Sequence, residues 1–394
     1  MQDLRNPEFS RRFDTRPRWV FSAPGRTELG GNHTDHQHGR VLAAAVDLDT
    51  RATVAKNDLG CLRILSEGYP LCRVALDDLA RKPEETGTTA ALIRGVAARF
   101  VQLGATLSGV DAYVTSTVLP GSGLSSSAAF EVLIGTILNT LFCGGRFTPV
   151  QIAQIGQWAE NVYFGKPCGL MDQTASAVGG VVAIDFQDPA APQVRRLDVD
   201  LHALGYALCI LDSGADHAAL TDEYAAIPAE MNAAAAVFGK TCLRDVAETD
   251  FYARLAEVRR AAGDRAALRA MHFFDDDRRV SRQADALARG DFDEFLRLVN
   301  ESGRSSWMLL QNVVPRGQTR EQPMAVALAL AEKLLGGRGA CRVHGGGFAG
   351  TIQAFVPLEQ LDAFRRGMEA ALGAGSCHVL SVRAAGGVLL EEYA

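Results

Sequence analysis

One short run of the chain, residues 120–129, has the residue types that bind phosphate groups. Its sequence, PGSGLSSSAA, joins a glycine-rich turn to three serines and to a segment with apolar residues three or four positions apart. Glycine lets the backbone approach a ligand closely, and the first N–H groups of a helix are unpaired and partly positive. A polyphosphate satisfies such groups. The run therefore predicts a phosphate cradle made of Gly121, Ser122, Gly123, Leu124, Ser125, Ser126, Ser127 and Ala128.

The same run has a second interpretation, because serines also begin ordinary core helices, where their hydroxyls cap the backbone. It lacks the lysine of the GxxxxGK[ST] motif, which argues against a P-loop NTPase.

Residues 24–39, PGRTELGGNHTDHQHG, place one arginine, three histidines and an aspartate between glycines. Charged donors and acceptors on a loop suit a ligand rich in hydroxyl groups. His33, Asp35, His36 and His38 could instead hold a metal ion, although their spacing matches no zinc motif. A solvated polar loop is the third interpretation.

Asp172 stands in the segment CGLMDQ, where Gly165, Pro167 and Gly169 interrupt one helix before another begins. The start of a helix favours an ionised carboxylate. Such a group could accept a hydroxyl proton or hold an attacking oxygen. Simple capping of the new helix is the alternative.

Residues 344–350, HGGGFAG, formally contain GxGxxG, which raises a dinucleotide-binding oxidoreductase as a different class of function. The segment that follows, 351–356, has the composition of a strand and not of a helix. We therefore expect a glycine loop between two strands, which packs against another backbone or closes over phosphates.

The composition indicates a globular protein that binds small ligands. Apolar residues make up 47% of the 394 positions, and the formal net charge of −6 argues against nucleic acid as the main partner. Eight scattered cysteines form no CxxC pair, and no stretch has the roughly 18 to 20 apolar residues of a membrane helix. The charged N-terminal residues lack the apolar stretch of a signal peptide. We expect a cytoplasmic protein with no membrane partner.

These motifs need elements that position them. A strand over 110–118 leads into the phosphate run and a helix follows it, and a cap at Thr148 begins a helix that reaches about residue 165. A domain boundary falls near 195–205. Other expected strands cover 19–23, 41–54, 181–186, 206–211, 340–343, 351–356 and 378–382, and other expected helices cover 86–104, 218–238, 251–271, 280–301 and 323–336.

The four motifs, in this order, resemble the galactokinase branch of the kinase superfamily that also includes homoserine, mevalonate and phosphomevalonate kinases. The resemblance covers residues 20 to about 356. It implies a two-domain α+β fold of the GHMP kinase type, with a mixed-sheet domain over 1–200 and a ferredoxin-like domain over 201–394 that carries the glycine loop 345–350. The active site would lie in the cleft between them. The implied reaction moves the γ-phosphoryl group of ATP to the anomeric hydroxyl of galactose.

The resemblance also implies roles for single residues. Arg26 and Asp172 would be catalytic, the arginine stabilising negative charge and the aspartate facing the anomeric hydroxyl, either as general base or as electrostatic anchor. Ser127 and Glu160 would hold Mg²⁺. The phosphate run with Gly346 and Gly347 would bind ATP.

On the sugar side, the resemblance assigns His33, Asp35, Tyr224 and Asn32 as contacts of the substrate. Galactokinases usually have a glutamate at the position of Asn32, where it accepts from the 6-hydroxyl of the sugar. A neutral amide would not repel a carboxylate, so the sequence raises a related substrate such as galacturonate. Glu28, where the family prefers asparagine, and His36 to His38, in place of Tyr-Asn-Gly, alter the same segment.

A catalytically silent sugar sensor of the same fold is a further alternative. Residues 125–129, Asp172 and Arg26 are intact, which favours the enzyme. We expect small-molecule partners only, and a monomer or weak homo-oligomer.

Overall fold

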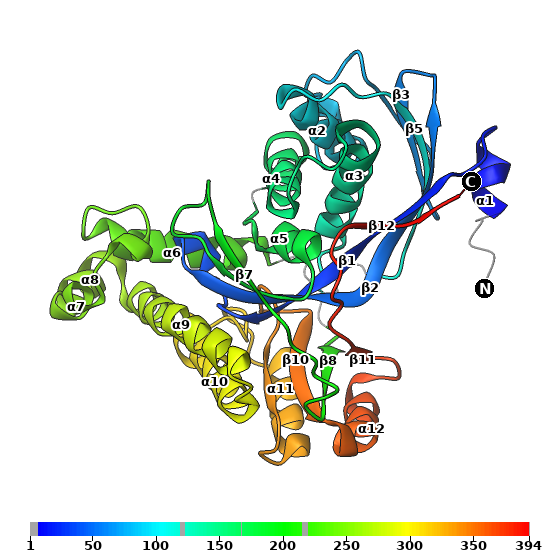
Figure 1. The fold of residues 1–394 in the computed structure, drawn as a ribbon. Helices are drawn as coiled ribbons and strands as arrows, with labels where there is room; N and C mark the ends of the chain where they lie inside the picture. The colour runs from blue at the N-terminus through cyan, green and yellow to red at the C-terminus, as the bar shows by residue number, and fades with distance from the viewer. Residues whose placement is uncertain (1–6, 119–122, 167, 215–219, 394) are drawn as a thin grey trace.

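The computed structural model describes residues 7–118, 123–166, 168–214 and 220–393 and contains two β-sheets (Figure 1). Gly121 and Ser122 of the predicted phosphate run therefore lie outside the described residues.

The first sheet has eight strands in the order β12-β1-β2-β5-β3-β4, with β6 also paired to β2 and β7 to β6. All pairs are antiparallel except β3 with β5, so the sheet is mixed, as predicted. Its strands are β1 (Trp19–Gly30), β2 (Arg40–Asn57), β3 (Cys61–Ser66), β4 (Cys72–Ala75), β5 (Gly109–Ser116), β6 (Val181–Asp185), β7 (Gln193–Leu197) and β12 (Val388–Glu392).

The helices α2, α3, α4 and α5 cover one face of this sheet (Figure 1) and enclose a core of aliphatic and aromatic side chains. The predicted start of a helix at Thr148 is confirmed, because its hydroxyl accepts from the Gln151 N–H at 3.3 Å while Gln151 Oε1 accepts from the Thr148 N–H at 2.9 Å. The helices of this part are α1 (Pro7–Arg12), η1 (Asp35–Gln37), η2 (Pro83–Glu85), α2 (Thr89–Gln102), α3 (Ser126–Cys143), α4 (Pro149–Ala159), the π-helix η3 (Glu160–Phe164) and α5 (Met171–Val178).

Helix α3 is the one helix within the described residues that is long and apolar enough to cross a membrane, and 56% of it is buried inside the fold. Its side chains Val132, Leu133 and Ile137 belong to the core beneath the first sheet. Burial of this kind is typical of a core helix.

The second sheet is antiparallel, in the order β11-β8-β10-β9. Alternate residues of β8 face opposite sides: Cys209 and Leu211 pack with α11 and α12, whereas Leu208 and Ile210 join a core shared with α9, α10 and β2. The strands are β8 (Tyr206–Asp212), β9 (Ala340–Val343), β10 (Thr351–Pro357) and β11 (Cys377–Leu380), and the nearby helices are α11 (Pro323–Leu335), η6 (Leu358–Gln360) and α12 (Leu361–Leu372).

A third layer of helices lies beside both sheets. Two predicted helices have wrong bounds here, because helical structure breaks at Arg254 (φ −107°, ψ 18°), Gly263 (φ 93°) and Gly290 (φ 72°). The expected helix over 251–271 is divided among three helices, and the one over 280–301 joins the end of α9 to α10. The elements are α6 (Thr221–Ala236), η4 (Leu243–Asp245), α7 (Glu248–Ala253), α8 (Leu255–Ala262), α9 (Asp264–Ala288), α10 (Phe292–Ser305) and the π-helix η5 (Ser306–Leu310).

The division at residue 200 stays a prediction, and the topology adds a feature that it did not include. The chain returns to the first sheet at its C-terminal end, where β12 pairs with β1. The two sheets are thus joined by more than one crossing of the chain.

Candidate functional site

Asp172, Arg26 and Ser125 form one hydrogen-bonded group. Arg26 Nε on β1 donates to Asp172 Oδ1 at 2.7 Å, and Ser125 Oγ donates to Asp172 Oδ2 at 2.7 Å. Burial alone would raise the pKa of Asp172, but the charge of Arg26 and these hydrogen bonds outweigh it and lower the pKa. Asp172 is therefore an ionised carboxylate at the first turn of α5. Its side chain remains 30% exposed, so a ligand can reach it.

Ser125 has a backbone conformation that serine rarely adopts. It precedes α3 with φ 56° and ψ 64°, in the left-handed region, and its hydroxyl binds Asp172 and does not cap the helix. No side chain caps the start of α3 within the described residues, so its first amides remain available to an anion. This favours the phosphate cradle over the serine-capped core helix.

The other described members of the run have distinct positions. Leu124 and Ala128 are fully buried, so only their backbones can face a ligand, and Ser126 and Ser127 are partly exposed in the first turn of α3. Gly123 accepts a hydrogen bond from Arg26 through its carbonyl. A Cβ on Gly123, where φ is 72°, would lie 3.1 Å from the ring of His344. The phosphate run therefore touches the glycine motif of the second sheet.

The two predicted metal ligands lie next to each other. Ser127 Oγ is 3.4 Å from Glu160 Oε1, and Lys166 Nζ lies 3.4 Å from the same oxygen. Gln173 Nε2 donates at 3.0 Å to Glu160 Oε2 and at 3.0 Å to Glu131 Oε2. Burial and the neighbouring Glu160 raise the pKa of Glu131 well above its ordinary value.

This arrangement fits Mg²⁺, which takes oxygen ligands and usually needs only one or two carboxylates besides phosphate and water. Within the described residues no three His, Cys, Asp or Glu side chains gather as a metal site. A metal ion held by Ser127 and Glu160 would therefore need further ligands from outside these side chains. The same finding removes the zinc-type alternative for residues 33–38.

His33 contacts the glycine loop in the second half of the chain, and Asp35 lies beside the segment that contains Asp172. His33 Nε2 donates to the Gly346 carbonyl at 3.0 Å, and burial and the neighbouring His36 lower the pKa of His33 to about 4. The imidazole is therefore neutral near pH 7. A Cβ on Gly169 would lie 2.3 Å from Asp35 Oδ2, so glycine at this position makes room for the carboxylate beside the Asp172 segment.

Tyr224 on α6 reaches the glycine loop from the other side. Its hydroxyl donates to the Gly347 carbonyl at 2.8 Å, and burial raises the pKa of Tyr224 to about 12. A Cβ on Gly346 would lie 2.6 Å from the tyrosine ring. The carbonyls of Gly346 and Gly347 are thus bound by side chains of the predicted sugar site, while their role in binding phosphate stays a prediction.

The glycine motif lies between the antiparallel strands β9 and β10, and no helix follows it. This confirms the expected strand-loop-strand context and removes the structural basis for a dinucleotide-binding motif.

Asn32 is fully buried, and all its polar groups bind protein groups. As a sugar contact it stays a prediction.

Several residues of this region were not predicted. They include Glu28 paired with Arg342, His344 between Thr27 and Thr351, and the partners of the Asn32 backbone on α9. Arg342 and His344 lie within the motif RVHGGGFAG. Their position beside the glycines could have identified them as residues of this region. His272, Asp276 and Asn312 belong to no motif.

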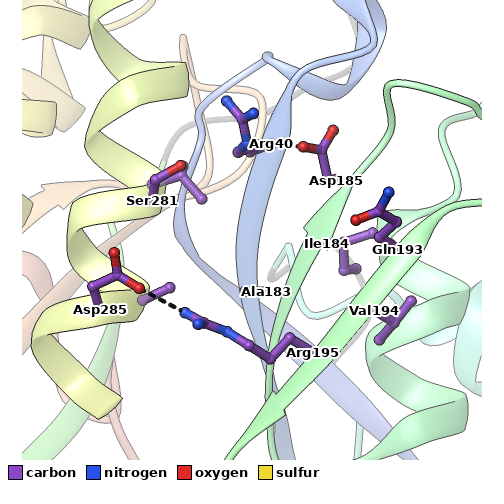
Figure 2. A pocket seen from close by; sticks show the side chains of 11 residues that line it. Arg40, Ala183, Ile184, Asp185, Gln193, Val194, Arg195, Ser281 and Asp285 are labelled. Atoms are coloured by element: carbon purple, nitrogen blue, oxygen red, sulfur yellow. Dashed lines mark hydrogen bonds and ion pairs between the residues drawn. The ribbon is translucent and has the colours of Figure 1, made fainter. Parts of the chain in front are cut away.

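A groove of about 460 Å³ lies apart from this site, between the β6–β7 hairpin and α9 (Figure 2). The charged side chains that line it form ion pairs with one another. The guanidinium of Arg195 donates to Asp285 Oδ1 at 3.1 Å, and Arg40 Nε lies 2.8 Å from Asp185 Oδ2. None of the predicted site residues lines it.

Comparison with known proteins supports the grouping of these motifs. Residues 7–56 match the family model described as the galactokinase galactose-binding signature, and residues 91–180 match the N-terminal domain of GHMP kinases. The galactokinase of Streptomyces coelicolor is 33% identical over 93% of this chain and 92% of its own length. The galactokinase of Glaesserella parasuis is 31% identical over 92% of each chain.

Two solved structures have the same fold as this chain. The crystal structure of Lactococcus lactis galactokinase complexed with galactose has a TM-score of 0.83 and 23% identity, and the match covers 98% of each chain. The L. major mevalonate kinase in complex with R-mevalonate has a TM-score of 0.61 and 16% identity, over 94% of this chain and 97% of its own.

Proposed function

The chain belongs to the galactokinase family, and from this premise we propose that it transfers the γ-phosphoryl group of ATP to the anomeric hydroxyl of D-galactose, giving galactose 1-phosphate and ADP. The observation that carries the proposal is the group formed by Asp172, Arg26 and Ser125 beside the uncapped start of α3. Family membership confirms the predicted GHMP kinase fold of the α+β class, the use of ATP, and the enzyme class, a phosphotransferase with an alcohol acceptor.

Phosphoryl transfer requires positioning and neutralisation of charge more than covalent chemistry by the protein. Asp172, ionised because Arg26 lowers its pKa, accepts a hydrogen bond from the anomeric hydroxyl and orients its oxygen toward the phosphorus. Arg26 stabilises the negative charge that develops on the transferred group. A carboxylate with a lowered pKa is a weak base, so Asp172 acts mainly by orientation and takes the proton late.

Ser127 and Glu160 would hold Mg²⁺, which when bound neutralises the phosphate oxygens. Gln173 keeps Glu160 in place through its amide. With a non-hydrolysable ATP analogue present, we expect the affinity for Mn²⁺, measured by electron paramagnetic resonance, to fall at least about 10-fold in Glu160→Gln. Unchanged affinity would contradict this assignment.

His33, Asp35 and Tyr224 would bind the sugar. The neutral imidazole of His33 retains Nδ1 as an acceptor, and the Asp35 carboxylate can accept from two neighbouring hydroxyls. The net charge of −6 and eight free cysteines support a cytoplasmic enzyme that works on small molecules. Its oligomeric state, a monomer or weak homo-oligomer, stays a prediction.

The test is release of ADP measured against a panel of free sugars that includes galactose and galacturonate. We expect turnover with galactose and a loss of at least about 10³-fold in kcat for Asp172→Asn, with galactose binding retained. Saturable binding of galactose without turnover of any sugar would identify a silent sensor instead. Preferred turnover of galacturonate would identify a related sugar kinase.

A further inference from the structure

We propose that Asn32 anchors the sugar-binding segment to the C-terminal half of the chain and so positions both the sugar and the glycine loop, without contacting the 6-hydroxyl. Asn32 would then be a positioning residue. This inference rests on the proposed function, because it concerns how the same site recognises its sugar.

The side chain of Asn32 has no hydrogen-bonding capacity left for a ligand. Its Nδ2 donates to the Gly345 carbonyl at 2.7 Å and to Glu28 Oε1 at 3.2 Å. Its Oδ1 accepts from Asn312 Nδ2 at 2.8 Å and from Ser306 Oγ at 3.2 Å. An amide has two N–H donors and two lone pairs, and all four are used. A sugar hydroxyl could bind only by breaking one of these buried bonds.

The backbone of Asn32 is held in the same way by helix α9. Its N–H donates to Asp276 Oδ2 at 2.9 Å, and its carbonyl accepts from His272 Nε2 at 3.0 Å. His272 and Asp276 are one turn apart on one face of α9. Ser305 lies 2.8 Å from His272 Nδ1, which accepts from its hydroxyl and leaves Nε2 as the protonated nitrogen.

Asn312 carries this anchoring on to the glycine loop. In addition to its bond with Asn32, the side-chain Nδ2 of Asn312 lies 3.2 Å from the Gly346 carbonyl. The backbone carbonyl of Asn312 accepts a hydrogen bond from the Phe348 N–H at 2.5 Å. A Cβ on Gly347 would lie 2.1 Å from that carbonyl, so the loop approaches Asn312 as only glycine allows. The pair Asn32–Asn312 therefore fixes the path of residues 345–348.

The charges explain why an amide stands at this position. Glu28 is buried and binds Arg342, and burial raises the pKa of the Glu28 carboxyl. A carboxylate at position 32 would face Glu28 across 3.2 Å and would lose the donor to Gly345. Glutamate at 28 and asparagine at 32 are thus complementary to each other. Neither residue indicates which substituent the sugar carries at C6.

The decisive experiment compares galactose with 6-deoxygalactose, which lacks only the 6-hydroxyl. For Asn32→Ala we expect kcat/KM to fall by about 10- to 100-fold on both sugars, with the ratio between them unchanged within about twofold. Asn312→Ala should show the same pattern. In the double variant, kcat/KM should fall by less than the product of the two single-variant factors. A loss confined to galactose would overturn the proposal.

A second readout separates an anchor from a sugar contact. Because the anchor holds the glycine loop, affinity for an ATP analogue without sugar should also fall several-fold in Asn32→Ala and in Asn312→Ala. Unchanged affinity in both variants would contradict the proposal. If Asn32→Ala does not fold, as judged by circular dichroism, Asn312→Ala supplies both comparisons.

Asn300→Ala is the matched control, because Asn300 also binds backbone groups, the Gly339 carbonyl at 3.2 Å and the Cys341 N–H at 3.1 Å, but at the start of β9. It should leave the affinity for the analogue unchanged. If the natural chain turned over no sugar, the proposed function would fail, and calorimetric binding of the two sugars would still test the anchor.

Discussion

The two sides of the site are assembled from different parts of the chain. On the phosphate side, Arg26, Ser125 and Asp172 bind one another and all lie before the second sheet begins. On the sugar side, Asn32 binds Asp276 and Gly345, which are 244 and 313 positions later. The group proposed to act in phosphoryl transfer therefore forms within the first half of the chain, whereas the proposed sugar segment is held by contacts with the second half.

This comparison predicts that variants on the sugar side lower stability together with sugar binding, and that variants on the phosphate side lower turnover while the fold is kept.

We expect the largest effect from Arg342→Met, which leaves the buried Glu28 without its charged partner. Removing one member of a buried ion pair costs about 3–5 kcal/mol of the free energy of unfolding. Urea denaturation would measure it. The double variant Glu28→Leu with Arg342→Met should recover much of the loss, and a double variant as unstable as the single one would contradict the explanation.

On the phosphate side, Arg26→Lys should lower kcat by about 10²- to 10³-fold with little change in stability. Lysine keeps the charge but cannot bind the Asp172 carboxylate and the Gly123 carbonyl together. Steady-state release of ADP measures kcat, and the melting temperature is the control. A kcat within threefold of the natural enzyme would show that charge alone is sufficient.

His344, where the two sides meet, should make stability depend on pH. Burial, together with Arg26 and Arg342, lowers its pKa to about 3 in the folded protein. Below the ordinary histidine pKa of about 6.5 the unfolded chain binds a proton that the folded protein does not, so stability falls as pH falls from about 6.5 toward 3. This residue alone should cost about 2 kcal/mol between pH 7 and pH 5. Urea unfolding at both pH values should show a smaller difference for His344→Gln.

The smallest effect concerns Ser125, whose hydroxyl and backbone can be tested separately. Both Ser125→Ala and Ser125→Gly remove the hydrogen bond to Asp172 and should lower kcat by about 10-fold. Glycine relieves the left-handed φ of 56°, so the glycine variant should be more stable than the alanine variant by about 1 kcal/mol. Equal melting temperatures would mean that the backbone there is not strained.

The sequence identified candidate site residues where they lie within one short segment. Arg26, Asp172 and the phosphate run could be proposed because each belongs to a contiguous motif, and the structure brings Arg26 and Asp172 together. Most strands followed from alternation and composition. The use of the Ser125 hydroxyl was not, because its partner Asp172 is 47 positions away. The partners of Asn32 could not be predicted for the same reason, because no motif near His272 or Asn312 indicates that they bind Asn32. The predicted bounds of helices in the Ala-rich region were wrong because helix periodicity continues across Gly263 and Gly290.

The pairing of β12 with β1 affects how the protein folds as it is synthesised. Ribosomes release a chain from its N-terminal end, and early parts fold first. One edge of β1 nevertheless has to wait for residues 388–392, which complete it. Until residues 388–392 have been synthesised, that edge presents unpaired N–H and C=O groups, a template for pairing with other chains. Aggregation of nascent or truncated chains should therefore begin at β1, at the opposite end of the sequence from the missing strand.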